Sequence, residues 1–336
     1  MQPPAALARY RRELDGYLRS LLHSGHPPSL YRMLRYHMGW EDTEGAPAES
    51  SGKALRPVLC LLSCEAAGAD WRRALPVAAG LELVHNFSLI HDDIQDRDPE
   101  RRHRPTVWRL WGEAQAINAG DALLMLARLA VLRLVEHTSP EAALAAARLL
   151  DQRTLEMVEG QVLDIEFEER LDVGVDAYLE MIDRKTGALF EAAYSLGALA
   201  AGRPQADVDA MGRSGRLLGI AFQVRDDIMG VWGSEEETGK RPAADVSRRK
   251  KSLPAVYALQ TAGDDLRRTY AKPELDDDDV AFVLRVIDKA GAADYCWSVV
   301  KEKQAEALAL LDGLRLEPGP AQELREVAGY LAARER

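Results

Sequence analysis

Apolar residues recur along most of the chain at the three- and four-residue spacing of amphipathic helices. Breaks in this pattern fall at clusters of Gly, Pro and Asp, as at 97–105, 202–206 and 233–246. No segment shows the alternation typical of a strand, so the pattern predicts an all-α protein. The expected helices cover residues 4–23, 28–39, 53–67, 71–96, 106–136, 140–168, 175–201, 205–232, 253–271, 278–290, 293–313 and 319–334.

Composition supports one helical domain. The 336 residues are 47% hydrophobic but only 6% aromatic, and no linker divides them, so we expect a single bundle over 1–336. The formal net charge of −11 argues against nucleic acid as a partner, because a surface that binds nucleic acid is normally basic. An anionic ligand would therefore need a local cluster of Lys and Arg, or metal ions.

Cysteine usage and apolar stretches indicate a cytoplasmic protein. Cys60 and Cys64 lie one helical turn apart and Cys296 is distant, which fits neither a zinc site nor a disulfide framework. The N-terminal residues lack the apolar segment of a signal peptide. The most apolar stretch, 119–135, contains Arg128 and Arg133, so we expect a core helix and no membrane span.

Two acidic clusters stand at the ends of apolar helices, LIHDDIQD at 89–96 and FQVRDDIMG at 222–230. Asp92 and Asp96 are four residues apart, so their carboxylates share one helix face. Such carboxylates repel each other unless a cation binds, and ligands that are all oxygen suit Mg²⁺. Asp226 and Asp227 could hold the same ions from a second helix.

A basic segment follows each acidic cluster, RRHR at 101–104 and GKRPAADVSRRKK at 239–251. One acidic cluster alone is commonly a solvated helix end. Two clusters, each with a basic loop behind it, favour a site where Mg²⁺ bridges carboxylates to a diphosphate. Arg and Lys would bind the remaining phosphate oxygens.

On these motifs the chain resembles the trans-prenyltransferase family, the polyprenyl diphosphate synthases, over about residues 50–260. The resemblance implies a helical bundle of the isoprenoid synthase type with a central active-site cavity, and a homodimer. The segments that carry it appear in family order: GKALRP (52–57), ELVHNFSLIHDDIQD (82–96), RRHRPTVW (101–108), AINAGDALL (116–124), GQVLDI (160–165), KTGALF (185–190), FQVRDDIMG (222–230) and GKRPAADVSRRKKSLP (239–254).

The same resemblance implies roles for single residues. The Mg²⁺ ligands would be Asp92, Asp96 and Asp226, with up to three ions bound beside the substrates. Positions that match the site for the diphosphate of isopentenyl diphosphate are Lys53, Arg56, His85 and Arg102. Positions that match the surroundings of the allylic diphosphate and its reacting carbons are Arg101, Lys185, Lys240, Lys250, Thr186 and Gln223.

The chemistry implied is ionisation of the allylic C–O bond, followed by attack of the double bond of isopentenyl diphosphate on the allylic cation. The departing diphosphate is stabilised by Mg²⁺ and basic side chains, and it then takes the proton that is lost. Phe222 or Phe87 could stabilise the cation over an aromatic ring, although simple core packing is the alternative for both.

Product length is predicted from the helix before the first acidic cluster. Gly80, Val84, Phe87, Ser88 and His91 recur at helical spacing and form a stripe leading away from Asp92. We expect the tail to descend along this stripe, where Gly80 and Ser88 are small and leave room, with Phe87 as the floor. In the family, one aromatic five residues before the first Asp, with no second aromatic and no insertion, favours geranylgeranyl diphosphate (C20). Farnesyl diphosphate (C15) is the alternative, and Phe87 could instead pack on a neighbouring helix.

Two positions depart from the family motifs. Gly230 stands where the second cluster usually has a further Asp, which lowers the acidic count on that side. His103 stands where the segment after the first cluster usually has Gly, and it is expected at a turn position that glycine occupies more easily.

Three other functions remain open at this point. A terpene cyclase on the same fold would share the first cluster, but Gly230 and Ser234 replace the Ser and Glu of its second motif. A di-iron bundle would use Glu82 and His85, but no second Glu-x-x-His is evident. A non-catalytic partner subunit is disfavoured because both acidic clusters are largely present.

Overall fold

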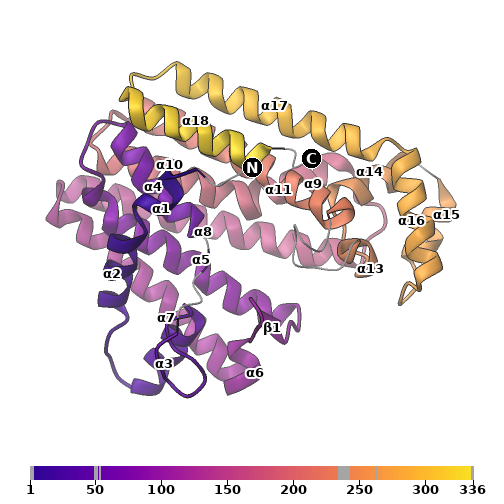
Figure 1. Ribbon diagram of the computed structural model, residues 1–336, viewed down its shortest axis with the longest axis horizontal. Coiled ribbons are helices and arrows are strands. Elements are labelled where there is room, and N and C mark those ends of the chain that lie inside the picture. Colours follow the sequence, from indigo (N-terminus) through magenta and orange to yellow (C-terminus); the bar gives the residue numbers. More distant parts are fainter. Residues whose placement is uncertain (1–3, 49–51, 53, 234–242, 262, 334–336) are drawn as a thin grey trace.

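The structure is a computed structural model that describes residues 4–48, 52, 54–233, 243–261 and 263–333. The prediction of an all-α protein is confirmed, with one very short hairpin added. Figure 1 shows α17 and α18 side by side along one edge, over a layer that contains α11 and α8. The N-terminal half provides α1 Ala6–Arg9, α2 Arg11–Leu21, α3 Pro28–His37, α4 Leu55–Ala66, α5 Leu75–Gln95, β1 Glu100–Arg101, β2 Arg104–Pro105, α6 Val107–Trp111, α7 Glu113–Leu132 and α8 Pro140–Glu168.

The C-terminal half completes the bundle. Its described helices are α9 Val175–Ile182, α10 Ala188–Ala200, α11 Gln205–Trp232, α13 Ala244–Ser247, α14 Leu253–Thr261, α15 Asp264–Tyr270, α16 Asp277–Lys289, α17 Ala292–Asp312 and α18 Pro318–Ala332. Short 3₁₀ turns η1 and η2 cover Trp71–Ala74 and Arg133–Glu136, and a π-helical turn η3 covers Asp183–Gly187. α11 packs on α10, on α17 and on η3, so it runs through the middle of this half.

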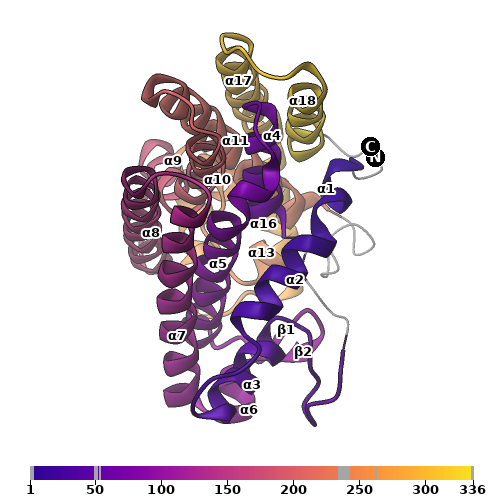
Figure 2. The same ribbon diagram turned by 90° about the vertical axis from the view of Figure 1, so that its left-hand side faces the viewer.

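Helix α5 is the central element of the N-terminal half. Pro76 stands in its first turn, where the missing N–H costs nothing, and most residues from there to Ile90 are apolar and buried, with Glu82, His85, Asn86 and Ser88 as the polar exceptions. Figure 2, seen along the bundle, shows α5 enclosed by its neighbours, and it packs on α7, α4, α10 and α2. Its polar residues are concentrated in the last turns, so the acidic cluster emerges where the buried helix ends.

Three predicted helices each divide at a single residue in the structure. The helix 4–23 divides at Tyr10, and 106–136 breaks at Gly112, which has φ of +85° and separates α6 from α7. The helix 253–271 breaks at Gly263, which also has positive φ. Glycine reaches this left-handed region without a Cβ clash, so both breaks are local effects that hydrophobic spacing does not report.

The prediction of no strand was wrong for the hairpin that follows α5. Glu100 pairs with Pro105 and Arg101 with Arg104, in antiparallel register. The loop between them is Arg102–His103, with φ of +53° and +59°, the two positive values of a tight primed turn. The expected turn position of His103 is thereby confirmed. The hairpin was missed because a two-residue charged strand shows no hydrophobic alternation.

None of the described helices combines the length and the apolar character that crossing a membrane would require. α7 instead buries one face against α5 and leaves Ile117, Met125, Leu129 and Leu132 exposed on the other. The core helix expected at 119–135 is therefore buried on one face and exposed on the other. Cys60, Cys64 and Cys296 are free and buried, as a core role predicts.

Candidate active site

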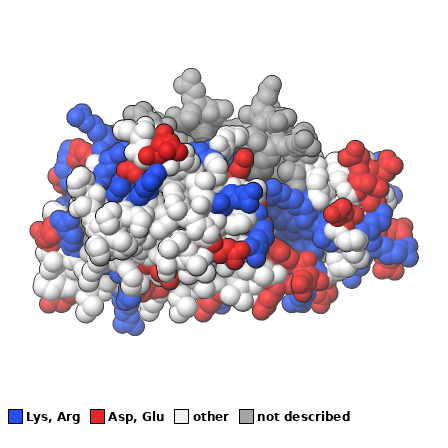
Figure 3. Space-filling model, turned by 90° about the horizontal axis from the view of Figure 1, so that it is seen from below, with Lys and Arg blue, Asp and Glu red and all other residues white. Residues whose placement is uncertain are grey.

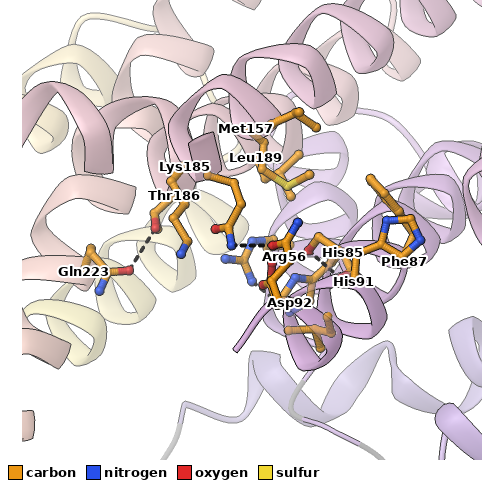
Figure 4. A pocket seen from close by; sticks show the side chains of 15 residues that line it. Arg56, His85, Phe87, His91, Asp92, Met157, Lys185, Thr186, Leu189 and Gln223 are labelled. Carbon is orange, nitrogen blue, oxygen red and sulfur yellow. Dashed lines mark hydrogen bonds between the residues drawn. The ribbon is translucent and has the colours of Figure 1, made fainter. Parts of the chain in front are cut away.

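A cavity of about 240 Å³ lies between α4, α5, α8, α10 and α11, beside the turn η3 (Figure 4). It brings together residues that stand up to 167 positions apart, since Arg56 and Gln223 both line it. Of the residues predicted from sequence, the cavity contains Arg56, His85, Phe87, Ser88, Asp92, Lys185, Thr186 and Gln223. The other lining residues are Leu89, His91, Gln95, Met157, Val158, Gln161 and Leu189.

The end of α5 provides the acidic side of the cavity. The N–H of Asp96 donates to the carbonyl of Asp92 at 2.8 Å, so the two residues lie one helical turn apart, as predicted. Burial, partly opposed by Lys185 and reinforced by nearby Asp96, raises the pKa of Asp92 to about 6. A carboxylate in this setting is stabilised by a cation, because burial disfavours its charge.

Asp93 has a different role from its neighbour Asp92. It is 2% exposed, and its carboxylate accepts from Nε of Arg101 at 2.7 Å. Arg101 comes from the first strand of the hairpin, so this ion pair ties the hairpin to the end of α5. In this structure Arg101 is thus held by protein, close to the acidic cluster but outside the lining of the main cavity.

Asp226 and Asp227 lie on different faces of α11, one exposed and one buried. The side chain of Asp226 is 46% exposed, and Arg225 lies 3.7 Å from its carboxylate. Asp227 is buried and accepts from the hydroxyl of Tyr178, from Nε2 of Gln223 at 3.1 Å and from the N–H of Leu253 at 3.1 Å. Asp226 is therefore accessible to a metal ion, while Asp227 is an internal hydrogen-bond centre.

Lys185 and Thr186 reach the cavity from the π-helical turn. Lys185 Nζ lies 2.5 Å from a carboxylate oxygen of Asp164 on α8. Thr186 donates from Oγ1 to Oε1 of Gln223 at 2.8 Å, the contact drawn in Figure 4. A chain of contacts thus runs from Thr186 through Gln223 to Asp227 across two elements.

Arg56 and His85 line the cavity from α4 and α5. Nη1 of Arg56 lies 3.3 Å from Nε2 of His85, and its guanidinium stands over the ring of Phe190. Burial, together with Arg56 and Arg102, lowers the pKa of His85 far below its ordinary value, so the ring is neutral. Because arginine can only donate, His85 accepts this hydrogen bond through Nε2.

Arg102 lies in a second, smaller cavity, which it shares with Arg101, Asp93 and His37. Its φ of +53° belongs to the hairpin loop, so a residue of this tight turn lines the cavity. Buried Glu82, on α5, links the two arginine sites electrostatically, because Arg56 and Arg102 both oppose the burial that raises the pKa of Glu82. This electrostatic link through Glu82 was not predicted from the sequence.

The remaining predicted residues differ in where they lie: one is at the second acidic cluster, one is outside the cavity and two are outside the described residues. Burial alone would lower the pKa of Lys250, but Asp227, Asp245, Asp164 and Asp226 raise it, so Lys250 stands among the carboxylates of the second cluster. Phe222 does not line the cavity; its ring packs 5.4 Å from that of Phe190. Lys53 and Lys240 lie outside the described residues.

Basic and acidic side chains meet at the surface of this region. Figure 3 shows Lys and Arg gathered at a hollow in one face of the molecule, with acidic side chains beside them. Side chains of both signs of charge are thus present at the rim of this hollow.

Gly230 is explained by its contact with α13. A Cβ at this position would lie only 2.1 Å from Oδ2 of Asp245, which is 8% exposed. The carboxylate of Asp245 therefore occupies the space that a side chain at 230 would need. Asp245 on α13 therefore places a carboxylate beside the position where α11 has Gly230 in place of an Asp.

The predicted path for the product tail was wrong at its far end. Phe87, Ser88 and His91 line the cavity, but Gly80 and Val84 do not. A Cβ at Gly80 would lie 2.5 Å from Cγ2 of Val131, so α7 already fills the space expected to be free. The glycine serves close packing of α5 on α7, which a single-helix stripe cannot distinguish from a cavity wall.

The donor set fits a hard cation shared with a ligand. Within the part of the chain that the structure describes, no three His, Cys, Asp or Glu side chains converge into a complete metal site. Asp92, Asp96 and Asp226 are carboxylates on two helices, and Mg²⁺ typically takes one or two carboxylates plus water and phosphate oxygens. These residues therefore suit Mg²⁺ ions that complete their coordination on a diphosphate.

Comparison with known proteins identifies the family of the chain. A family model described as polyprenyl synthetase matches residues 46–287. The (2E,6E)-farnesyl diphosphate synthase of Mycobacterium tuberculosis is 40% identical over 316 residues, which are 92% of this chain and 87% of that protein. The geranylgeranyl diphosphate synthase of the same species is 39% identical over 317 residues, 93% and 89% of the two chains.

Solved structures show the same similarity. Polyprenyl synthetase from Streptomyces coelicolor superposes with a TM-score of 0.91 at 37% identity, covering 98% of this chain and 99% of that one. Polyprenyl synthase from Caulobacter crescentus, complexed with calcium and isoprenyl diphosphate, has a TM-score of 0.81 at 26% identity, with 99% of each chain covered.

An all-helical bundle that presents acidic clusters on two helices beside a cavity is an isoprenoid synthase fold. The chain belongs to the polyprenyl synthetase family, and it is a prenyltransferase of the trans-isoprenyl diphosphate synthase class.

Proposed function

We propose that this enzyme condenses isopentenyl diphosphate head-to-tail with an allylic diphosphate in a Mg²⁺-dependent reaction, with geranylgeranyl diphosphate as its product. One observation carries the proposal. A single cavity joins the half-buried carboxylate of Asp92 to the cations Arg56 and Lys185, and apolar side chains that include Phe87 line the same space. Such a space suits a molecule with an anionic head and a hydrocarbon tail.

The residues divide between two diphosphates. Arg56 and Arg102, with His85 as a neutral partner, bind the diphosphate of isopentenyl diphosphate, joined by Lys53. Lys185 and Lys250, with Arg101 and Lys240, bind the allylic diphosphate as it departs. When bound, Mg²⁺ at Asp92, Asp96 and Asp226 neutralises charge on that leaving group. Up to three ions fit this donor set.

Several side chains prepare the space in which the cation forms. Thr186 and Gln223, joined by a hydrogen bond, present polar oxygens beside the reacting carbons. Met157 and Leu189 complete an apolar wall that excludes water from the cation. The departing diphosphate takes the proton, so the chain needs no general base of its own.

Phe87 ends the cavity and thereby selects the C20 product. Its ring meets that of His91 almost perpendicularly, at 5.3 Å between centroids, so the floor is a packed pair of rings on α5. Ser88 beside it leaves room that a second aromatic would remove. Farnesyl diphosphate is the second candidate, and the curated relatives at about 40% identity include synthases of both lengths.

The rival functions find less support in the geometry. For a di-iron site, His85 would have to give up the hydrogen bond it accepts from Arg56, and Glu82 lies beside Asn86, whose Nδ2 donates to it at 3.1 Å. For a terpene cyclase, the arginines of the second diphosphate site would have no substrate group to bind. For a non-catalytic subunit, a complete cavity lined with polar and basic groups would have no use.

An exposed apolar face supports a homodimer. Leu129, Leu144 and Leu155 on α7 and α8 are 61%, 68% and 61% exposed, and several further apolar residues surround them. Water contact on this scale is costly, and contiguous apolar patches of this kind usually mark interfaces. We place the second copy of the chain on this face. We further propose one domain over 1–336 and a cytoplasmic location, with which the free thiols are compatible.

The first prediction tests the reaction and its metal site. Purified protein with Mg²⁺, isopentenyl diphosphate and farnesyl diphosphate should release pyrophosphate, and chelation should stop the reaction. Asp92→Asn should lower kcat by about a hundredfold or more, because it removes a carboxylate ligand. Its melting temperature should not fall, because burial already disfavours the charge.

Asp312→Asn, in an exposed ion pair with Arg325 on α17 and α18, is the matched control and should leave turnover unchanged. Turnover of Asp92→Asn within tenfold of the unmodified protein at saturating Mg²⁺ would remove Asp92 from the metal site.

The second prediction separates the two diphosphate sites. Arg56→Met should raise the KM for isopentenyl diphosphate more than that for the allylic substrate, and Lys185→Met should do the reverse. A charged hydrogen bond contributes about 1.5–3 kcal/mol, so each larger effect should be on the order of ten- to hundredfold. Steady-state kinetics with each substrate varied in turn measures this, and equal effects on both substrates would contradict the division.

The third prediction concerns product length. Phe87→Ala should lengthen the product beyond C20, but by few units, because Val131 closes the region behind it at Gly80. The substitution should also cost about 3 kcal/mol of stability. Chromatography of the dephosphorylated lipids measures the lengths, with Leu83→Ala as a control that empties core space on α5 outside the cavity. An active Phe87→Ala enzyme with unchanged products would show that the floor lies elsewhere.

The fourth prediction tests the dimer. Leu129→Glu places a charge at the centre of the exposed apolar face, so it should convert a dimer of the unmodified protein into a monomer. Light scattering after size-exclusion chromatography gives the mass directly. Lys301→Glu, an exposed position on α17, should leave the dimer intact. A Leu129→Glu protein that remains dimeric would move the interface to another surface.

A further inference from the structure

The π-helical turn η3 carries two residues of the allylic site, Lys185 and Thr186, and it has an unusually dense set of supports. π-helical turns are rare, are held in place by their surroundings and frequently occur at functional sites. Glycines let two helices approach its backbone. A Cβ at Gly160 on α8 would lie 2.3 Å from the nitrogen of Lys185, and one at Gly219 on α11 would lie 2.9 Å from Cα of Gly187.

Arg216 binds the start of this turn. Its Nε and Nη2 donate to the two carboxylate oxygens of Asp183, each at 2.6 Å, in a bidentate ion pair. Its Nη1 donates to Glu191 on α10 at 2.7 Å and to Glu156 on α8 at 3.0 Å. One guanidinium thus joins the turn to three helices, and its side chain is only 23% exposed, so solvent screens these bonds weakly.

The contacts of α11 with the turn follow one stripe. Arg216, Gly219 and Gln223 are spaced by three and four residues, so they share a helix face. Along that face, Arg216 holds Asp183, Gly219 admits the backbone of Gly187, and Gln223 accepts from Thr186. Helix α11 therefore grips the turn at both ends, once by an ion pair and once by a hydrogen bond inside the cavity.

We infer that Arg216 is a positioning residue of the allylic site, which it serves by fixing through Asp183 the turn that carries Lys185 and Thr186. This inference rests on the proposed function, because it assigns the allylic diphosphate to Lys185. Arg216 does not line the cavity and touches no reacting atom. Its effect is geometric, since a shift of the turn moves the ammonium of Lys185 and the hydroxyl of Thr186 together.

The experiment compares two substitutions that break the pair from opposite ends. Arg216→Met removes the guanidinium group that binds Asp183 in two places. The carboxylates of Asp183, Glu156 and Glu191 then lose the cation that they share. Asp183→Asn keeps the shape of its side chain and leaves Arg216 paired with both glutamates. Both should raise the KM for the allylic diphosphate or lower kcat by roughly tenfold to a hundredfold, and the KM for isopentenyl diphosphate should stay within about twofold.

The matched control is Arg203→Met. Arg203 pairs with Asp207 at 2.6 Å, with the same 23% exposure, at the other end of α11. Its loss should lower the melting temperature about as much as Arg216→Met without changing either KM. Arg216→Lys keeps the positive charge but cannot form the bidentate ion pair with Asp183. It should therefore recover only part of the binding of the allylic diphosphate.

Binding of inorganic pyrophosphate with Mg²⁺, measured by calorimetry, provides a second readout without turnover. It should weaken in Arg216→Met and Asp183→Asn but not in Arg203→Met. Lower melting temperatures with unchanged kinetic constants and unchanged pyrophosphate binding would overturn the inference and leave Arg216 a purely structural residue. If the unmodified protein formed no prenyl product, the proposed function would fail instead.

Discussion

The structure depends above all on keeping ionised side chains inside an apolar helical bundle. Isolated charges are too costly to bury, so each must have a partner or a ligand. The structure provides partners for most of them: Lys185 has Asp164, Arg101 has Asp93, and Arg216 has three carboxylates. Asp92 is the informative case, because burial raises its pKa to about 6 and the nearest cation offsets only part of that cost. A site held in this state is prepared for a cation that arrives with the substrate.

Much of this could be predicted from the sequence because it is local. Helical spacing predicts nearly every helix, and the four-residue separation of Asp92 and Asp96 already places them on one face. The interpretation of His103 as a turn residue held for the same reason, since positive φ is a property of one or two residues. The breaks at Gly112 and Gly263 were missed although they are local, because a glycine within a helical pattern is compatible with both a helix and its end.

What could not be predicted depends on contacts between distant helices. Gly80 looked like space for a substrate tail, yet Val131, fifty-one positions later, fills that space. Gly230 looked like a lost carboxylate, yet Asp245 reaches the same place from α13. Arg216 belongs to none of the sequence motifs, and its role was not predicted because it depends on three carboxylates on other elements. In each case hydrophobic spacing within one helix cannot report which neighbour the residue meets.

These contacts explain how a rigid bundle can set both the head and the tail of one substrate. At the diphosphate end, Gly160 and Gly219 let α8 and α11 pack closely against the turn η3. The ion pair between Arg216 and Asp183 then fixes the position of this turn. At the tail, the rings of Phe87 and His91 rest on α5, whose own position is fixed by its close approach to α7 at Gly80. The position of the turn and the position of the two rings therefore both depend on short helix–helix distances that small residues permit. In the proposed function Phe87 is the floor, and its distance from Asp92 is set by α5 because both residues lie on that helix. The proposal therefore makes chain length depend on the size of the side chains on one helix, and makes binding of the allylic diphosphate depend on how firmly other helices hold one turn against it.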